Sequence, residues 1–403
     1  MRFLITSSRN PYALDMVRKL ATQGHTVFAS DTFDWAAGSH SRYLAGHEVT
    51  ASPRHDTARF MADIEDIVRR HRIDMVLPGF EETFYLATRH AQLSQLTTLY
   101  TGQFAQLARL HDKVSFQRMA TQVGAPIPRT LVAHDDASLR DAIAQFPQYF
   151  ARAAFSRGGV ALLTNSGPLA GKVAVEDCHP SQEQPWLVQE YLDGPMVCSY
   201  STLHEGRVTA HCTYRAPHQW EHSTGISFLA LDSAPTLDVV RRFAEPMRYS
   251  GQLSFDFVDH GGKLFLIECN PRPTDGVLLM TPEHLTAGIA EPDAPLSVVE
   301  PGKEVQLDFA VLAELFKEPI KQAPRTIHDL VHTQDFGHGW HDHMPMLWSF
   351  ATMARGEWTS HRQRVAVLEA MADDIVWNGE PIDGMSAEDA ATLEAVHSER
   401  LTS

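Results

Sequence analysis

Residues 253–272 read Leu253-Ser254-Phe255-Asp256-Phe257-Val258-Asp259-His260-Gly261-Gly262-Lys263-Leu264-Phe265-Leu266-Ile267-Glu268-Cys269-Asn270-Pro271-Arg272 and have the pattern of a β-hairpin. Strand side chains alternate between two faces, so Glu268 and Asn270 share one face. We expect an odd-length hairpin loop to place Asp256 on that same face. Two carboxylates and an amide oxygen would then converge, and such ligands suit Mg²⁺ that bridges nucleotide phosphates.

Arg272 follows two residues after Asn270 and could bind a phosphate or carboxylate through its fork of N–H donors. The alternative is a solvated hairpin face that carries polar residues without a binding role. Pro271 ends the strand directly after Asn270, so the polar cluster lies at a strand end. That position favours a functional site.

The first third of the chain alternates strand-like and helix-like segments. We expect strands at Phe3–Thr6, Thr26–Ser30 and Asp74–Pro78, and helices at Pro11–Gln23 and Asp56–Arg70. This alternation implies right-handed crossovers and a parallel sheet. No GxGxxG follows the first strand, so the dinucleotide-binding fingerprint is absent.

From about Gln103 the pattern changes to short strands joined by hairpins. A helix at Lys113–Val123 ends at Gly124. The other expected elements are helices at Ala137–Phe146 and Thr236–Tyr249 and strands at Tyr149–Ala153, Val160–Leu163, Trp186–Tyr191, Val197–Leu203, Val208–Tyr214, Leu253–Val258 and Leu264–Glu268. Beyond about Glu291 we expect two or three helices, of which Arg362–Asp373 is the clearest.

The hairpin resembles the closing motif of the ATP-grasp superfamily, an acidic strand followed by Glu-x-Asn-x-Arg. Upstream segments match that family in order and spacing. They are Leu110-His111-Asp112-Lys113, Gly124-Ala125-Pro126-Ile127-Pro128, the glycine-rich Ser156-Arg157-Gly158-Gly159-Val160 and the hinge Val188-Gln189-Glu190-Tyr191-Leu192. The resemblance covers about residues 103–290. Leu77-Pro78-Gly79-Phe80-Glu81-Glu82 looks closest to ligases related to the carbamoyl-phosphate synthetase large chain.

The resemblance implies a fold and a set of roles. The fold is an α/β parallel-sheet domain (1–102), an α+β ATP-grasp domain of two subdomains around the nucleotide (103–290, divided at about 187/188) and a mainly helical C-terminal region (291–403). Two Mg²⁺ ions, or Mn²⁺, would be held by Asp256, Glu268 and Asn270. ATP would be bound by Lys113, Arg152, Ser156, Gly158 and Gly159 at its phosphates and by Gln189, Glu190, Tyr191 and Leu192 at its adenine. The catalytic residues would be Arg272 and Arg215.

Two positions depart from the family pattern. The family has a second phosphate-binding lysine in the strand before the glycine-rich loop, and Arg152 occupies that place here. Arginine keeps the charge but prefers bidentate contacts. After the hinge, the family often has a Glu shortly after the glycine, whereas this chain reads Gly194-Pro195-Met196-Val197. The ribose contact is therefore unassigned.

The implied reaction is ligation of a carboxylate to an amine through an acyl phosphate, with release of ADP and phosphate. The partners would be a small-molecule carboxylate and an amine, in two molecules or one, and a homodimer is possible. The alternatives are a phosphotransferase, a carboxylase on the same fold, or a non-catalytic nucleotide-binding regulator. Arg152 favours the regulator weakly, and the intact set of metal-binding residues opposes it.

The composition limits the classes of function that the chain can have. The 403 residues carry a formal net charge of -16 and no basic run, which argues against a nucleic-acid surface. No window approaches 18 apolar residues, and the N-terminus lacks the pattern of a signal peptide, so we expect no membrane association. The four cysteines form no CxxC pair. We expect a cytoplasmic protein.

Three other segments are weaker candidates. Gly167–Lys172 resembles a Walker loop superficially, but Val173 stands where Ser or Thr is needed. His338-Gly339-Trp340-His341-Asp342-His343 could bind zinc, although a polar loop is the simpler interpretation. The polar segment Tyr214–Gly225 is either an exposed loop or a lid near the γ-phosphate, with Arg215 as the phosphate contact.

Overall fold

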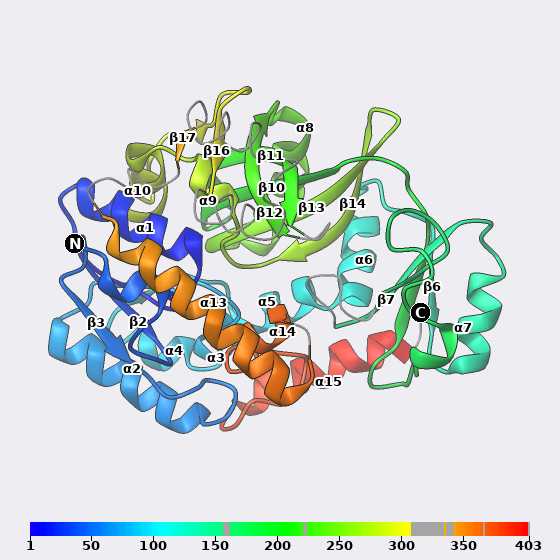
Figure 1. The fold of residues 1–403 in the computed structure, drawn as a ribbon, viewed down its shortest axis with the longest axis horizontal. Coiled ribbons are helices and arrows are strands. Elements are labelled where there is room, and N and C mark those ends of the chain that lie inside the picture. The colour runs from blue at the N-terminus through cyan, green and yellow to red at the C-terminus, as the bar shows by residue number, and fades with distance from the viewer. Residues whose placement is uncertain (156–161, 221–223, 308–333, 336–341, 366, 402–403) are drawn as a thin grey trace.

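The computed structural model describes residues 1–155, 162–220, 224–307, 334–335, 342–365 and 367–401. Within these residues the chain forms an N-terminal parallel sheet, a small antiparallel sheet, a larger and mainly antiparallel sheet, and a set of C-terminal helices (Figure 1).

The N-terminal unit is a parallel sheet with helices on both faces, in the strand order β3-β2-β1-β4-β5. Along β1, Leu4 packs in one hydrophobic cluster with α2, whereas Phe3 and Ile5 pack in a second cluster with α1, because successive side chains point to opposite faces. The elements are β1 (Arg2–Ile5), α1 (Pro11–Thr22), β2 (Thr26–Asp31), the 3-10 helix η1 (Ala37–His40), β3 (Gly46–Val49), α2 (Thr57–His71), β4 (Met75–Leu77), α3 (Glu82–Ala87), α4 (His90–Leu93) and β5 (Thr98–Leu99).

A small antiparallel sheet follows two connecting helices. Its strand order is β6-β9-β7-β8, with α7 packed on one face around Leu139 and Trp186. The elements are α5 (Phe104–His111), α6 (Lys113–Gln122), β6 (Thr130–Ala133), α7 (Asp136–Ile143), β7 (Tyr149–Ala153), β8 (Leu162–Thr164), the 3-10 helix η2 (Val175–Asp177) and β9 (Trp186–Glu190).

A larger sheet has the order β14-β13-β10-β11-β12-β16-β17, and β15 pairs with β11. Strands beyond residue 290 therefore join the same sheet as the hairpin β13–β14. The elements are β10 (Met196–His204), β11 (Arg207–Trp220), β12 (Thr224–Leu231), α8 (Ala234–Met247), β13 (Gly251–His260), β14 (Lys263–Asn270), α9 (Gly276–Leu279), α10 (Pro282–Ala290), β15 (Ser297–Val298), β16 (Glu304–Gln306) and β17 (Gln334–Asp335).

The C-terminal helices return to the first half of the chain. They are α13 (Met344–Gln363), α14 (Val367–Ala372) and α15 (Ala387–Leu401), and α15 runs along α5 and α6 toward the small sheet (Figure 1). The expected single helix Arg362–Asp373 is wrong, because Arg364 adopts a left-handed conformation (φ 59°) that ends α13. Among the described residues, no helix is both long and apolar enough to cross a membrane.

The expected loop Tyr214–Gly225 is also wrong for most of its length. Strand β11 continues to Trp220, and β12 begins at Thr224. From Tyr214 to Pro217 the side chains alternate between the more buried and the exposed side of the strand. Polar residues on the solvent face of an antiparallel strand gave this segment the appearance of a loop.

We predict that His211 makes the fold sensitive to acid. Its ring is buried between Ser201 Oγ (2.8 Å from Nδ1) and Thr236 Oγ1 (3.0 Å from Nε2). Burial and the charge of Arg241 lower the pKa of His211 to about 3, from an unfolded value of about 6.5. Below pH 6.5 the unfolded chain binds a proton that the folded chain does not, so stability falls as the pH falls.

Between pH 7.5 and 5.5 this linkage removes about 1.4 kcal/mol of unfolding free energy. Urea unfolding of wild type and His211→Gln at both pH values measures it. The wild type should lose about that much more stability than the variant, and equal losses would contradict the prediction.

Candidate functional site

The hairpin β13–β14 carries the predicted metal ligands Asp256, Glu268 and Asn270. Its turn is the pair Gly261-Gly262, both with positive φ (62° and 82°), between His260 and Lys263. The expected odd-length loop is therefore wrong. A β-bulge corrects the parity instead, because Phe257 pairs with Leu266 but Asp256 pairs with Glu268. The extra residue in β14 returns Glu268 to the face of Asp256.

Three oxygen-bearing side chains meet on this face. Asp256 lies directly opposite Glu268, and Asn270 Nδ2 donates to Asp256 Oδ2 over 3.0 Å. Asp256 and Glu268 are half-buried. Burial and the neighbouring Glu268 carboxylate raise the pKa of Asp256 to about 6. The like charges are crowded, and a divalent cation would relieve that crowding.

Two cations from distant segments approach the same carboxylate. Lys113, the first residue of α6, is 2% exposed and places Nζ 3.5 Å from Glu268 Oε1. Arg152, on β7, places Nη1 2.7 Å from Glu268 Oε2. Burial would raise the pKa of Glu268, but Lys113 and Arg152 outweigh it and lower that pKa to about 2. The hairpin, the start of α6 and the small sheet therefore meet at Glu268.

Arg272 extends from the end of the hairpin toward the N-terminal unit. Its guanidinium lies over the Phe80 ring at 4.4 Å, and Nη2 is 4.0 Å from Glu81 Oε1. The loop after β4 is fixed by Glu82, which accepts hydrogen bonds from the Ser7 hydroxyl and from the N–H groups of residues 79 and 80. This loop follows β4, next to β1 in the sheet, where the strand order reverses and open α/β sheets bind ligands.

Asp275 interacts electrostatically with Asp256 and Arg272 and was not predicted from the sequence. It is half-buried, and burial together with the charge of Asp256 raises its pKa to about 7, although Arg272 opposes the shift. A carboxylate three residues after Arg272, between Thr274 and Gly276, was the available signal. Asp275 is thus a third carboxylate near the hairpin face, in addition to Asp256 and Glu268.

The predicted hinge lies between the small sheet and the hairpin. Tyr191 N–H donates to the Gln148 carbonyl over 3.0 Å, and the Glu190 carboxylate accepts from Arg129 N–H over 2.8 Å. A side chain at Gly194 would collide with the Asp259 carbonyl, which lies 1.9 Å from the position of a Cβ. The glycine therefore allows the hinge to pack against the end of β13.

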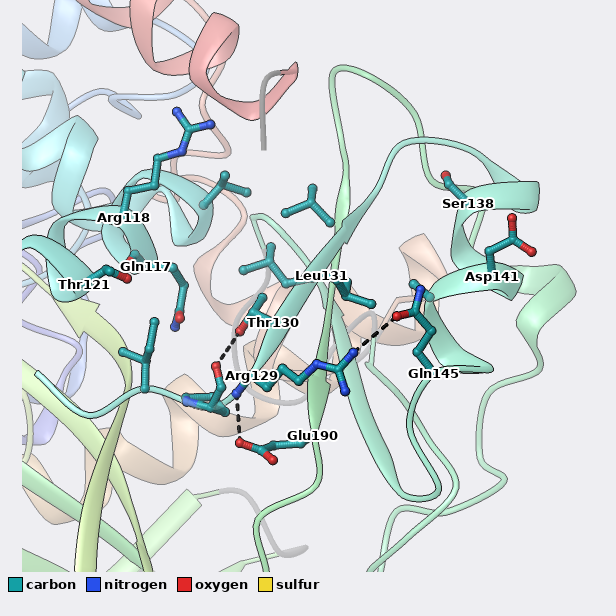
Figure 2. Close-up of a pocket in the computed structure, with 16 residues that line it drawn as sticks. Gln117, Arg118, Thr121, Arg129, Thr130, Leu131, Ser138, Asp141, Gln145 and Glu190 are labelled. Atoms are coloured by element: carbon teal, nitrogen blue, oxygen red, sulfur yellow. Dashed lines mark hydrogen bonds between the residues drawn. The ribbon is translucent and has the colours of Figure 1, made fainter.

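A cavity of about 780 Å³ lies next to Glu190 of the hinge (Figure 2). It lies between α6, α7 and β6, which is an edge strand of the small sheet. Gln117 lines it and is 7% exposed, with neither amide atom hydrogen-bonded. Of the predicted site residues within the described chain, only Glu190 lines this cavity. It is separate from the hairpin face.

Comparison with known proteins gives the fold. No family model and no curated protein matches the sequence. Among solved structures, phosphoribosylamine–glycine ligase from Thermotoga maritima is 15% identical, over 75% of this chain and 78% of that one, with a TM-score of 0.57. N5-carboxyaminoimidazole synthetase from Staphylococcus aureus with ADP is 12% identical over 79% and 86%, with a TM-score of 0.60. Biotin carboxylase from Campylobacter jejuni is 13% identical over 71% and 70%, with a TM-score of 0.54.

The chain has the ATP-grasp fold. The α/β N-terminal unit, the two antiparallel or mainly antiparallel sheets and the C-terminal helices confirm the expected fold class. At 12–15% identity the likeness extends to the ATP-grasp fold alone, and the roles of individual residues stay predictions.

Several predicted residues of the ATP-grasp site are not placed. Ser156, Gly158 and Gly159 lie outside the described residues, as do His338 and His341. Asp342 lies within them and forms a buried ion pair with Arg18 (2.8 Å). No group of three or more His, Cys, Asp or Glu side chains suited to a metal occurs in the described part of the chain.

Arg215 is placed away from the hairpin face. Asp256, Cys198 and Tyr214 are cross-strand neighbours and share one face of the large sheet. Arg215 follows Tyr214, so it points to the opposite face, and it is exposed. The structure does not bring it to Glu268, and its catalytic role stays a prediction.

Proposed function

We propose that this chain is an ATP-dependent ligase that joins a carboxylate to an amine, through an acyl phosphate, and releases ADP and phosphate. One observation carries the proposal. Asp256, Glu268 and Asn270 share a face, and that face meets Lys113 and Arg152 from two other elements. Solved ligases and a carboxylase with the same fold support the choice of reaction class.

The donor set fits magnesium. Mg²⁺ takes one or two protein carboxylates and completes its coordination with water and substrate phosphates. Asp256 and Glu268 would supply the carboxylates, and Asn270 would turn its amide oxygen toward the ion. The bound ions would offset the charge of the nucleotide phosphates.

The chain's own side chains would bind and orient the nucleotide and the acid through their positions and charges. Lys113 and Arg152 would bind phosphate oxygens, since both are held at the hairpin face by Glu268. The backbone of Tyr191 and Leu192 would contact adenine. Arg272, flanked by Phe80 and Glu81, would hold the acid beside the γ-phosphate. Such preorganised cations stabilise developing charge without moving during the reaction.

The proposed reaction balances as two displacements. A carboxylate oxygen of the acid attacks the γ-phosphorus, and ADP leaves with the electrons of the broken P–O bond. The amine nitrogen then attacks the acyl carbon, phosphate leaves, and the amine loses a proton. The chain would need to supply no covalent nucleophile.

We predict that turnover forms ADP and phosphate, and that hydroxylamine traps the activated acid as a hydroxamate. Phosphorus NMR of a mixture with ATP, Mg²⁺ and a panel of acids identifies the products, and ferric iron detects the hydroxamate. A parallel mixture without acid controls for ATP hydrolysis.

Each alternative outcome has a meaning. Pyrophosphate as the main product would reject the mechanism even with this fold. ADP without hydroxamate across the panel would favour the phosphotransferase. Nucleotide binding without turnover would favour the regulator.

A further inference from the structure

The last turn of α15 reaches the start of the helix that carries Lys113. Arg400 is 1% exposed, and its Nε donates to Asp112 Oδ2 over 2.8 Å. Asp112 is itself fully buried and is the N-cap of α6, since its Oδ1 accepts from Ser115 N–H over 2.7 Å. Residues 288 positions apart thus form an ion pair next to Lys113.

Arg400 makes two further contacts. Its guanidinium lies 4.5 Å above the Phe155 ring, and Nη1 donates to the Glu183 carbonyl over 2.8 Å. Phe155 follows the end of β7, three residues after Arg152, and Ala154 between them accepts from Lys113 Nζ at 3.5 Å. One guanidinium therefore joins the segments that present both cations to Glu268.

We propose that Arg400 is a positioning residue for the nucleotide phosphates, holding the N-cap of α6 and the end of β7 so that Lys113 and Arg152 converge on one point. This inference rests on the proposed function. It makes the end of α15 part of the nucleotide site, although Arg400 itself touches no phosphate. A displacement of about 1 Å in such a contact can cost about a hundredfold in rate.

The choice of arginine fits this role. Three acceptors surround it in different directions, namely a carboxylate, a carbonyl and an aromatic face. The planar fork of arginine can serve all three together, whereas the single ammonium of lysine cannot. Glu399, one residue earlier, instead pairs with Arg109 at 2.6 Å at a more exposed place and offers a matched control.

The test compares affinities for MgADP and AMP by calorimetry in the full-length chain. In Arg400→Lys we expect MgADP affinity to fall at least tenfold while AMP affinity changes little, because AMP lacks the phosphate that Lys113 would bind. Glu399→Ala should leave both affinities unchanged. Equal losses for MgADP and AMP, or no loss for either, would overturn the inference.

A second variant tests the inference in case a single substitution at Arg400 causes misfolding. Arg400→Gln alone leaves Asp112 buried without its partner and could unfold the chain. The double variant Asp112→Asn with Arg400→Gln keeps a good N-cap and removes both charges. Folded protein with wild-type MgADP affinity would overturn the inference, and selective weakening would support it. The wild type is measured first, because a wild type that binds no MgADP would overturn the proposed function itself.

Discussion

Replacing Glu268 by alanine should abolish nearly all ATP turnover while the chain stays folded, although less stably, because the buried Lys113 and Arg152 lose their shared carboxylate. Glu268 is the one carboxylate in the described chain that faces Asp256 across the hairpin and also meets both Lys113 and Arg152. Its loss would remove a metal ligand and leave the two cations without their shared partner. We expect kcat/KM for MgATP to fall by about a thousandfold or more, since several kcal/mol of charge stabilisation is lost.

Steady-state ADP release measures this effect, and circular dichroism checks the fold. Glu304→Ala is the control, because Glu304 is an exposed carboxylate on β16 of the same sheet. It should keep wild-type turnover. Near-normal turnover of Glu268→Ala in saturating Mg²⁺ would remove Glu268 from the site and would undermine the choice of the hairpin face.

The sequence predicted the three central strands and the two longer helices of the N-terminal unit because their patterns are local, whereas the short elements β3, α3, α4 and β5 were not predicted. Helices Pro11–Thr22 and Thr57–His71 carry apolar residues at helical spacing, and their ends lie within one residue of the expectation. The shared face of Asp256, Glu268 and Asn270 was also correct, but for a reason other than the one given. A β-bulge is an irregularity of strand pairing, and no residue type in β14 predicts it.

The two wrongly predicted segments also depend on features that local sequence does not show. Whether a polar run such as Tyr214–Gly225 forms a loop or a strand depends on its partner strand, here β12, which local patterning does not show. The break at Arg364 required a left-handed residue that is not glycine, which sequence patterns seldom reveal.

The contribution of the C-terminal region could not be predicted from local sequence. The Trp377 ring is fully buried against Phe84, Phe104 and Phe155, and the backbone N–H of Trp377 donates to Glu81 Oε2 over 3.0 Å. Asp374 pairs with Arg9 at 2.7 Å. These contacts join residues about 220 to 365 positions apart, and only the folded chain brings them together. The region that lacked a recognisable motif thus packs against the predicted site.

Replacing Lys113 by methionine should weaken MgADP binding and turnover by about a hundredfold, while the protein stays folded. Methionine has a similar length and suits a buried position, whereas the ammonium that lies 3.5 Å from Glu268 would be lost. The loss should fall on the phosphates, so AMP affinity should change little. Removing this cation would also raise the pKa of Glu268, because Lys113 is the largest of the effects that lower it.

Lys263→Met is the matched control, because Lys263 is an exposed lysine at the start of β14 in the same hairpin. It should bind MgADP as the wild type does. If Lys113→Met lost AMP and MgADP affinity equally, Lys113 would support the adenine side or the fold rather than the phosphates. If it lost neither, the buried ammonium would serve only to balance the Glu268 charge, and Arg152 would remain as the phosphate contact at the hairpin face.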